Sequence, residues 1–398
     1  MFNHVDYYPG DPILGLNDLY NKDTRAEKVN LGVGVYYDED GNLPLLDSVL
    51  KAEAERAKAP QARPYLPMSG LASYNNAVQR LLFGADSAAV TEGRIATIQS
   101  IGGSGALRVG AEFVKQYFAQ SKVYVSKPTW GNHISIFEAA GLEVGEYPYY
   151  DAATGGVKFD ALLEAFKGYN KHDVVLLHPC CHNPTGVDLT PAQWDALLDV
   201  VKERELLAFM DIAYQGFGDD FETDVYAIRK AEALGLSYFV SSSFSKNLSF
   251  YGERLGALSV VCATAEEKRL VFSQLQFIVR RLYSNPPCHP ATIASDVLNS
   301  DELFALWTEE VAQMRVRIKE MRQRLFEVLS AKVPGRDFSY ITAQRGMFSF
   351  SGLSPEQVAR LASEFGIYLV SNGRMCVAGL NTKNIDYVAN AFVAVLQD

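Results

Sequence analysis

Short, nearly continuous apolar runs alternate with longer helical patterns through the middle of the chain. Five runs rich in Val, Leu and Phe have the length of strands: Lys122–Ser126, Asp173–His178, Leu206–Asp211, Tyr238–Ser242 and Ala257–Val261. Strands that are buried on both faces show such continuous runs, whereas strands with one exposed face alternate apolar and polar residues. The pattern therefore predicts the strands of a buried, mostly parallel sheet.

The segments between these runs have helical periodicity, as in Leu107–Phe118, Trp130–Ala140 and Pro191–Glu205. The third segment follows Thr190, a favourable N-cap residue, and has proline at its first helical position. Strands that alternate with helices form βαβ units around a parallel sheet. We therefore predict an α/β fold for this part of the chain.

The pattern changes after residue 300. From Asp301 to Lys332 the chain contains no Gly or Pro and its apolar residues recur at helical spacing, which predicts one long amphipathic helix or two in series. Short strand-like runs follow at Met347–Phe350, Ile367–Val370 and Met375–Ala378, with a helix between them. This mixture predicts a second, smaller α+β domain.

Net charge and composition argue against some classes of binding partner. The 398 residues suggest two or three domains, and the formal net charge of -10 disfavours nucleic acid, because binding a phosphate backbone requires a basic surface. We interpret Arg315, Arg322 and Arg324 of the long helical segment as part of a solvated face. Five cysteines without regular spacing indicate reduced thiols in a cytoplasmic protein. We expect neither a signal peptide nor a membrane span.

Lys246 is the first candidate for chemistry. It lies in the segment SSSFSKN, just after an apolar run, and open α/β sheets bind ligands at the carboxyl ends of their strands. Arg254 follows eight positions later in YGERLGA. Most lysines are solvated surface groups. A lysine that is partly desolvated and close to another cation can instead attack a carbonyl carbon.

Asp211 and Tyr214 follow the neighbouring apolar run in the segment DIAYQGFG. A carboxylate at the end of so apolar a run is costly unless it is paired. It can be a helix N-cap or part of a structural ion pair. Alternatively, it faces a cationic atom of a ligand, and Tyr214 donates a hydrogen bond in the same pocket.

Two further segments have more than one interpretation. Gly102-Gly103-Ser104-Gly105 opens a helix, so it is either a plain turn or an anion site, but it has neither the P-loop nor the dinucleotide-binding spacing. The segment HPCCHNPTG, from His178 to Gly186, contains zinc-type ligands but has no second ligand cluster. It also reads as a turn that directs Asn183 towards the crevice at the strand ends.

Two isolated arginines suit carboxylate recognition. Arg374 lies in SNGRMCVAGL and Arg280 in VRRLYSNPP, each beside an apolar or turn segment. A guanidinium can hold a carboxylate through two parallel hydrogen bonds. A structural ion pair explains each of them equally well on local sequence alone.

In this order, the motifs HNPTG, DIAYQGFG, SFSKN, YGERLGA, YSNPP and GRMCVAG resemble the fold-type I aminotransferases, which depend on pyridoxal phosphate. The bacterial aspartate and aromatic-amino-acid aminotransferases are the most similar, and the resemblance extends almost end to end. It implies a large domain over 44–309, with a mostly parallel seven-stranded sheet flanked by helices. It also implies a small α+β domain over 1–43 and 310–398, and a homodimer with shared active sites.

The resemblance also implies roles for single residues. Lys246 would carry pyridoxal phosphate as a Schiff base and move a proton, and Asp211, supported by His178, would pair with the pyridinium nitrogen. The catalytic set is Lys246, Asp211, Tyr214 and Trp130. The other cofactor-binding residues are Gly102, Gly103, Ser104, His178, Asn183, Ser243, Arg254 and, from the partner subunit, Tyr65. The substrate-binding residues are Gly34, Trp130, Asn183, Arg374 for the α-carboxylate and, from the partner subunit, Arg280 for a distal carboxylate.

Specificity rests on fewer residues. Tyr37, Leu43 and Ser104 are similar to the aromatic-accepting members, Asn285 resembles the aspartate-specific ones, and Pro64 matches neither group. We expect ping-pong transfer of the amino group from tyrosine, phenylalanine, tryptophan and aspartate to 2-oxoglutarate. A strict aspartate aminotransferase is the alternative.

Other functions are possible on this fold. They include a decarboxylase or β-lyase, the effector domain of a transcriptional regulator, and a structural protein with a dead site. The two arginines favour transamination. We expect no fused DNA-binding segment, since the chain starts with the family's own first segment, and every cofactor-contacting position that can be matched is intact.

Overall fold

A computed structural model describes residues 1–8, 10 and 12–397 of the chain. The chain divides into a large unit, Pro44–Val316, and a small unit made of Met1–Leu43 and Arg317–Asp398. The first boundary coincides with the one expected between residues 43 and 44. The second lies after Val316 rather than after residue 309, because helix α12 (Asp301–Lys332) runs unbroken through both positions. Residues 9, 11 and 398 of the domain prediction lie outside the described residues.

The large unit alternates helices and strands, as the apolar pattern predicted. Its elements are α2 (Asp47–Lys58), α3 (Ala72–Phe83), α4 (Ala88–Thr91), β2 (Ile95–Ile101), α5 (Gly102–Tyr117), β3 (Val123–Lys127), α6 (Gly131–Ala139), β4 (Val144–Pro148), β5 (Tyr150–Asp151), β6 (Gly156–Val157), α7 (Phe159–Lys167), β7 (Val174–Leu177), α8 (Pro191–Glu203), β8 (Leu207–Ile212), η1 (Thr223–Val225), α9 (Tyr226–Ala233), β9 (Tyr238–Ser243), β10 (Leu255–Val261), α10 (Ala265–Leu282) and α11 (Cys288–Asn299), followed by the start of α12.

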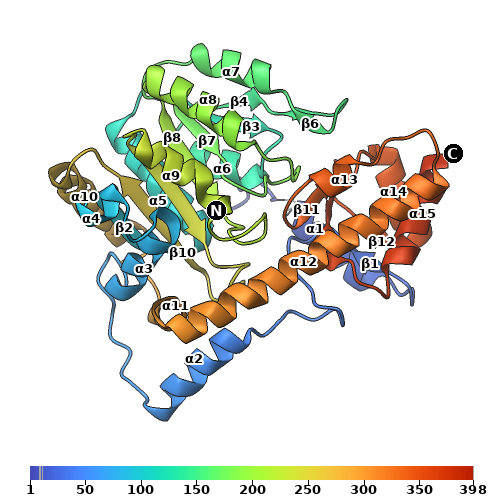
Figure 1. Cartoon of the computed structure of the whole chain (residues 1–398), viewed down its shortest axis with the longest axis horizontal. Helices are drawn as coiled ribbons and strands as arrows, with labels where there is room; N and C mark the ends of the chain where they lie inside the picture. The colour runs from blue at the N-terminus through green and yellow to red at the C-terminus, as the bar shows by residue number, and fades with distance from the viewer. Residues whose placement is uncertain (9, 11, 398) are drawn as a thin grey trace. The chain divides into compact units, whose positions relative to one another are not determined.

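The main sheet has, within the described residues, seven strands in the order β2-β10-β9-β8-β7-β3-β4. The strands β9, β8, β7, β3 and β4 are parallel to one another, and β10 is antiparallel to both of its neighbours. Figure 1 shows helices α5, α6, α8 and α9 gathered around this sheet. The predicted α/β fold with a mostly parallel sheet is therefore confirmed.

The five strands predicted from apolar runs are all present, and two more strands were not predicted. β2 is fully paired on one side with β10, but it contains Thr97, Gln99 and Ser100 among its buried residues. Thr97 Oγ1 lies 2.8 Å from Ser259 Oγ of β10, so this polar position is satisfied across the sheet. β4 is an edge strand with an exposed Glu146. Neither strand leaves a continuous apolar run.

Aromatic rings fill the core between the sheet and α5. Phe209 of β8 stacks on Phe239 of β9, with ring centroids 5.2 Å apart, and meets Phe137 of α6 edge-on at 5.5 Å. Gly110 lies in the middle of α5, where a Cβ would stand 2.4 Å from the Phe209 ring. Glycine lowers helix propensity, so its presence here reflects the close approach of helix and sheet. The same core fixes the position of the strand ends.

Capping confirms one predicted helix start. The side chain of Thr190 accepts a hydrogen bond from the backbone of Gln193, the Gln193 side chain accepts one from the backbone N–H of Thr190, and Pro191 occupies the first helical position. Such a capping box contributes about 1 kcal/mol to helix stability. The start of α8 at Pro191 follows the HNPTG segment, so the path of this segment ends at a fixed point.

The small unit contains short strands between helices, as predicted. Its elements are α1 (Pro12–Lys22), β1 (Val29–Asn30), α13 (Tyr340–Ala343), β11 (Phe348–Phe350), α14 (Pro355–Phe365), β12 (Ile367–Tyr368), β13 (Arg374–Cys376), η2 (Val377–Gly379) and α15 (Ile385–Gln397), with the end of α12. β1 pairs with β12 and β11 with β13, so the first segment of the chain belongs to this unit. None of the helices in the described residues combines the length and apolar character needed to cross a membrane.

The long helix is α12, but our interpretation of its arginines as solvated was wrong for Arg322. Arg322 is buried and donates hydrogen bonds to the carbonyl oxygens of Ile341, Gly346 and Phe348. Arg315 donates to the carbonyl of Gly216 at 2.7 Å, whereas Arg324 forms an exposed ion pair. Arg322 is buried because distant segments bring backbone carbonyl oxygens to it. The spacing of apolar residues along the helix gives no information on these acceptors.

Candidate active site

The predicted site residues of the large unit gather at one edge of the main sheet. Parallel strands end at the same edge, and open α/β sheets bind ligands there. The antiparallel strand β10 begins at this edge, so the residue before it arrives there as well. We call this the carboxyl edge. The residues at or just beyond it are Gly102 and Gly103 after β2, Trp130 after β3, His178 and Asn183 after β7, Asp211 and Tyr214 at the end of β8, Ser243 and Lys246 at the end of β9, and Arg254 before β10.

Asp211 is held by a buried histidine. Its Oδ2 lies 3.0 Å from His133 Nε2, and His133 Nδ1 lies 2.9 Å from Thr129 Oγ1. When the Thr129 hydroxyl donates to Nδ1, Nε2 carries the proton and donates to the carboxylate. Burial raises the pKa of Asp211, but the hydrogen bond and the charge interaction with His133, together with smaller contributions from His178 and Ser241, outweigh burial, so this pKa lies below its usual value. Asp211 is therefore ionised at neutral pH.

The second oxygen of Asp211 has a different environment. Oδ1 is buried and has no hydrogen-bond partner among the residues that the structure describes. Leaving a buried carboxylate oxygen without a donor is costly. This oxygen therefore fits a ligand that presents a protonated, positively polarised N–H group.

His178, which we expected to support Asp211, makes no hydrogen bond to it. Its two ring nitrogens lack hydrogen-bond partners in the described part of the chain, and its ring centroid lies 5.1 Å from that of His133 and 4.5 Å from that of His182. Burial, and then the nearby His133, lower the pKa of His178 to about 3, so it is neutral at physiological pH. The direct support of Asp211 comes instead from His133, which we did not single out.

Lys246 and Tyr214 come from neighbouring strands and lie close together. Lys246 follows β9 and Tyr214 follows β8, and these strands pair in parallel. Lys246 Nζ lies 4.9 Å from the centroid of the Tyr214 ring. Tyr214 is buried and Lys246 is half-buried. The fold thus holds a primary amine and a phenol together at the carboxyl edge, as the sequence predicted.

The start of α5 forms a narrow cradle with two other segments. A Cβ on Gly102, whose φ is +63°, would stand 2.7 Å from Arg254 Nη2, and a Cβ on Gly103 would stand 3.3 Å from Ser243 Cβ. Arg254 Nη1 donates to Ser245 Oγ at 3.3 Å, and Ser104 lies in the first turn of the helix. Backbone N–H groups at a helix start, a guanidinium and hydroxyls together favour a phosphate.

Trp130 and Asn183 border the same edge. Trp130 is half-buried immediately before α6, and its ring meets that of His133 edge-on with centroids 5.1 Å apart. Asn183 Oδ1 is buried and has no hydrogen-bond partner among the described residues. Trp130 is therefore placed next to the histidine that contacts Asp211.

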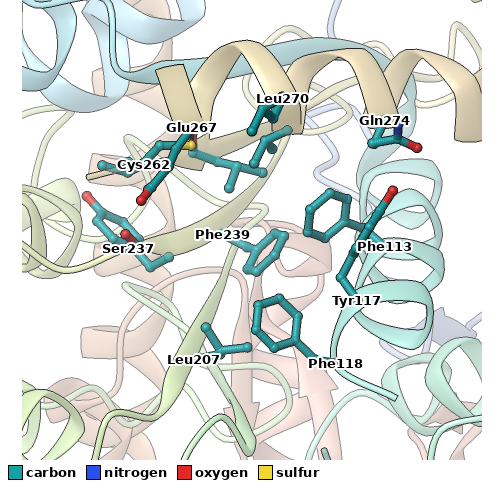
Figure 2. A pocket seen from close by; sticks show the side chains of 14 residues that line it. Phe113, Tyr117, Phe118, Leu207, Ser237, Phe239, Cys262, Glu267, Leu270 and Gln274 are labelled. Atoms are coloured by element: carbon teal, nitrogen blue, oxygen red, sulfur yellow. Dashed lines mark hydrogen bonds between the residues drawn. The ribbon is translucent and has the colours of Figure 1, made fainter. Parts of the chain in front are cut away.

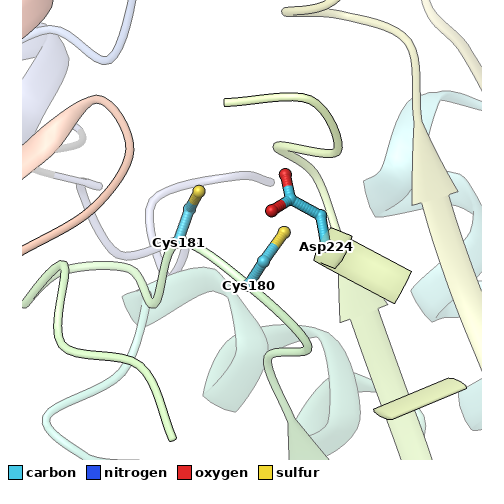
Figure 3. A group of neighbouring side chains, drawn as sticks. All are labelled: Cys180, Cys181 and Asp224. Atoms are coloured by element: carbon cyan, nitrogen blue, oxygen red, sulfur yellow. The ribbon is translucent and has the colours of Figure 1, made fainter. Parts of the chain in front are cut away.

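The zinc interpretation of HPCCHNPTG loses support from its surroundings. Cys180, Cys181 and Asp224 have ligand atoms within 4.8 Å of one another, and Figure 3 shows the Cys180 thiol and the Asp224 carboxylate pointing towards the same space. The Asp224 oxygens, however, accept hydrogen bonds from the backbone N–H groups of Gly216, Gly218 and Asp219 at 2.8–3.0 Å. This carboxylate closes a loop, so we assign the cluster a structural role.

In the small unit, Arg374 and Gly34 both contact Phe348. The Arg374 guanidinium carbon lies 4.4 Å from the centroid of the Phe348 ring, and its Nη2 donates to the carbonyl oxygen of Gly32. A Cβ on Gly34 would stand 2.6 Å from Phe348 Cζ, so only glycine allows this approach. Arg374 is thus positioned near Gly34, as expected, through a phenylalanine that we had not assigned to the site.

Tyr65 and Arg280, both predicted to act on a partner subunit, lie at the surface of the large unit. Tyr65 has 92% of its surface exposed. Arg280, at the end of α10, is exposed and donates a hydrogen bond to Ser284 Oγ. Their predicted contacts with cofactor and substrate stay predictions.

The residues of the carboxyl edge fit pyridoxal phosphate in three places. Asp211 Oδ1 provides an acceptor for a protonated ring nitrogen. The Gly102–Arg254 cradle suits a phosphate, and Lys246 offers an amine for the aldehyde. Each of these observations is independent of the others, and together they match the three functional groups of one cofactor.

Comparison with known proteins gives the same answer. Residues 26–392 match the family model described as aminotransferase class I and II. The chain is 55% identical over 397 residues to the aromatic-amino-acid aminotransferase of Escherichia coli (strain K12), which covers all of both chains. The chain belongs to the class I and II aminotransferases.

Two solved structures support the fold and the cofactor of this aminotransferase. A psychrophilic aromatic amino acids aminotransferase from Psychrobacter sp. B6, cocrystallised with aspartic acid, has a TM-score of 0.99 and 61% identity and covers both chains completely. An aromatic-amino-acid aminotransferase from Burkholderia pseudomallei, covalently bound to pyridoxal phosphate, has a TM-score of 0.98 and 54% identity and covers 100% of this chain and 99% of that one. The protein is a pyridoxal-phosphate-dependent transaminase.

Sequence reasoning missed three residues that support the site of this transaminase. His133 lies one helical turn after Trp130, and a histidine so close to the predicted ring-stacking residue was a usable signal. Ser245, which contacts Arg254, belongs to a serine-rich segment that the sequence had already marked. Phe348 gave no separate signal, because an apolar residue in a strand is usually part of the core.

Proposed function

We propose that this transaminase moves the amino group of tyrosine, phenylalanine, tryptophan and aspartate to 2-oxoglutarate by a ping-pong mechanism, with the cofactor linked covalently to Lys246. The observation that carries the proposal is that the amine of Lys246 and the carboxylate of Asp211 both lie at the carboxyl edge. An amine lies just after β9, and a buried, ionised carboxylate lies near the end of β8 with one oxygen that has no hydrogen-bond partner among the described residues.

Pyridoxal phosphate, when bound, supplies an electron sink for a carbanion at the substrate Cα. Asp211 Oδ1 would accept a hydrogen bond from a protonated ring nitrogen and so stabilise the proton there. His133 and Thr129 hold this carboxylate in place through the 3.0 Å and 2.9 Å contacts. Gly103, Ser243 and Arg254 would hold the phosphate.

Lys246, once its amine is free, would act as the proton carrier. Its Nζ would accept the proton of the substrate Cα and pass it to the cofactor, and holding that C–H bond beside the amine would select transamination over cleavage of another bond. The Tyr214 ring, whose centroid lies 4.9 Å from Nζ, would help to orient the amine. Arg374 would bind the α-carboxylate through its guanidinium fork. The Phe348 ring lies against this guanidinium, with its centroid 4.4 Å from the guanidinium carbon.

The covalent link provides the first test. Reduction of the loaded enzyme with borohydride, followed by peptide mapping, should place the label on Lys246. A label on another side chain, or none, contradicts the proposal. Addition of single amino acids should then convert the visible cofactor absorbance to that of the pyridoxamine form. The 2-oxoglutarate consumed should equal the amino acid consumed, which separates transamination from decarboxylation and β-elimination.

Dual specificity requires Arg280 to serve two kinds of substrate. A guanidinium binds a distal carboxylate well, but burying it against an aromatic ring without a partner is expensive. Arg280 is exposed and hydrogen-bonded to Ser284, so a solvated position away from the substrate is available. The structure of the Psychrobacter enzyme, an aromatic amino acids aminotransferase cocrystallised with aspartic acid, also favours dual use.

Arg280→Ala tests this role. The variant should lose about 100-fold or more in kcat/KM on aspartate, because a charge-assisted contact disappears, while phenylalanine should change by only a few-fold. Equal losses on both substrates contradict the role. A wild-type enzyme that turns over aspartate but no aromatic amino acid would establish the alternative, a strict aspartate aminotransferase.

We also propose a homodimer in which each active site uses Tyr65 and Arg280 of the partner subunit. The high exposure of Tyr65, and of Phe2 and Tyr7 near the start of the chain, supports a covered surface. Mixing Lys246→Ala with Arg280→Ala protein should restore activity on aspartate, since a mixed dimer contains one site with both residues intact. No gain over the separate variants contradicts the shared site. The five free cysteines favour a reducing compartment, and we propose the cytoplasm.

A further inference from the structure

The opposite edge of the main sheet contains a cavity unrelated to the transaminase site. Leu207 begins β8, Tyr238 begins β9, and the antiparallel strand β10 ends at Val261, so these residues lie at the edge away from Lys246. A cavity of about 350 Å³ opens between these strands, the end of α5 and the start of α10. We call it the amino-edge cavity.

The walls of the amino-edge cavity are aromatic and aliphatic. Figure 2 shows Phe113 and Phe118 from the end of α5, Phe239 and Leu207 from the sheet, and Leu270 from α10 around a common space. Cys262 is buried at one side, and burial raises the pKa of its thiol to about 12, so it stays neutral. Few polar groups are available to hold ordered water, and apolar cavities bind apolar molecules rather than water.

Apolar character continues to the mouth of the cavity. Tyr117 and Leu270 line it, yet 46% and 51% of their surfaces are exposed. Folding normally places large apolar side chains where they pack, and protein interiors leave few voids. A cavity with an apolar floor and an apolar mouth has the size and lining of a small-molecule site.

The charge of the cavity lining limits the kinds of ligand that can bind. Among the described residues that line the cavity, Glu267 is the one with a charge, and its Oε2 accepts a hydrogen bond from the backbone N–H of Ala263. A carboxylate at the mouth repels anionic ligands and attracts an N–H donor. The rings of Phe113, Phe118 and Phe239, which also line the cavity, favour a flat molecule that can contact them edge-on or face-on.

We propose that the amino-edge cavity binds an uncharged, flat aromatic molecule that carries an N–H donor, with its rings among the Phe side chains and its N–H directed to Glu267. Indole is the smallest probe with these features. It should bind to the loaded enzyme with a dissociation constant below about 1 mM, as expected for a ligand of its size in an apolar pocket.

Variants distinguish this cavity from the transaminase site, which would also accept aromatic rings. Val271→Trp places a large side chain in the cavity from α10, whereas Ser273→Trp, two residues later and exposed, adds the same side chain outside it. Calorimetric titration of indole should show at least tenfold weaker binding for Val271→Trp and unchanged binding for Ser273→Trp. Both variants should retain the transaminase activity of the wild type, which also reports that they fold.

Indole-3-acetate and a charge variant test the part played by Glu267. Binding to the amino-edge cavity is the binding that Val271→Trp removes. To this cavity the anion should bind several-fold more weakly than indole, and Glu267→Gln should reduce that difference. If Val271→Trp fails to fold, Gln274→Trp fills the same cavity from the next turn of α10. Indole binding that both filling variants leave intact, or the absence of saturable binding to the wild type, overturns the proposal. A crystal soaked with bromoindole should locate the ligand in the amino-edge cavity, against Phe113 and Phe239.

Discussion

The two edges of the main sheet are made by the same strands, yet they have opposite chemistry. At the carboxyl edge, Asp211 lies near the end of β8 and Lys246 follows β9; one Asp211 oxygen contacts His133, whereas the other is buried without a hydrogen-bond partner among the described residues. At the amino edge the same strands begin with Leu207 and Tyr238 beside an apolar cavity. Backbone pairing satisfies the backbone polar groups of the strand interiors, and the side chains at the two ends of each strand differ in chemistry. Catalysis and the proposed aromatic ligand therefore occupy opposite ends of one scaffold.

The largest expected contrast between the edges is in catalysis. Lys246→Ala removes the proton carrier and the covalent link, so kcat/KM should fall by about 10⁴-fold or more on every amino acid. Steady-state kinetics with aspartate and phenylalanine measure the loss. Lys268→Ala, near the amino edge, is the matched control and should stay within about twofold of the wild type. If Lys246→Ala retained a tenth of the wild-type activity, the assignment of catalysis to the carboxyl edge would be wrong.

Asp211→Asn should cause the next largest loss. An amide has no charge to keep the proton on the ring nitrogen, so kcat should fall by about 10²–10³-fold, typical of removing one preorganised electrostatic contact. Single-turnover absorbance changes measure the step directly. His133→Leu leaves the carboxylate in place but removes the interaction that lowers its pKa, so the loss should be smaller and the acid limb of the pH profile should move upwards. An equal loss in both variants would contradict this division of roles.

At the amino edge the expected effect is on stability. Phe239→Ala removes a ring that stacks on Phe209 and contacts Phe113, which should lower the free energy of unfolding by about 3 kcal/mol. Urea unfolding of the apoenzyme measures this change. Ser243→Ala, at the other end of the same strand, should change stability by less than about 1 kcal/mol but weaken cofactor binding. A catalytic defect in folded Phe239→Ala would show that the edges are not independent.

The smallest effect concerns the pH dependence of stability. The pKa of His178 is about 3 in the folded chain and near 6.5 when unfolded, so the unfolded state binds more protons between these values. The free energy of unfolding should therefore decrease as pH falls below about 6.5, by about 1.4 kcal/mol per pH unit from this residue. His178→Asn should remove that part of the slope between pH 7 and pH 5. An unchanged slope would mean that His178 is not buried in its neutral form.

Some strands and site residues of the main sheet could be predicted from the sequence, and others could not. The five apolar runs predicted their strands because residues buried on both faces must be apolar along the whole strand. Asp211 was found because a carboxylate that ends so apolar a run is costly unless it is paired, and Lys246 because it follows a serine-rich segment at the carboxyl end of such a run. β2 and β4 escaped notice because cross-strand polar contacts and an exposed edge break the apolar run.

By itself, the sequence determined the α/β class, the strands that carry the site and the membership of the aminotransferases. The tertiary structure alone decided that His133, 78 residues away, hydrogen-bonds Asp211, that Arg322 is buried, and that a cavity lies at the amino edge. Hydrophobic periodicity reports whether a residue faces a core. It carries no information on which distant side chain or backbone carbonyl will be its neighbour, because that depends on the segments that fold side by side.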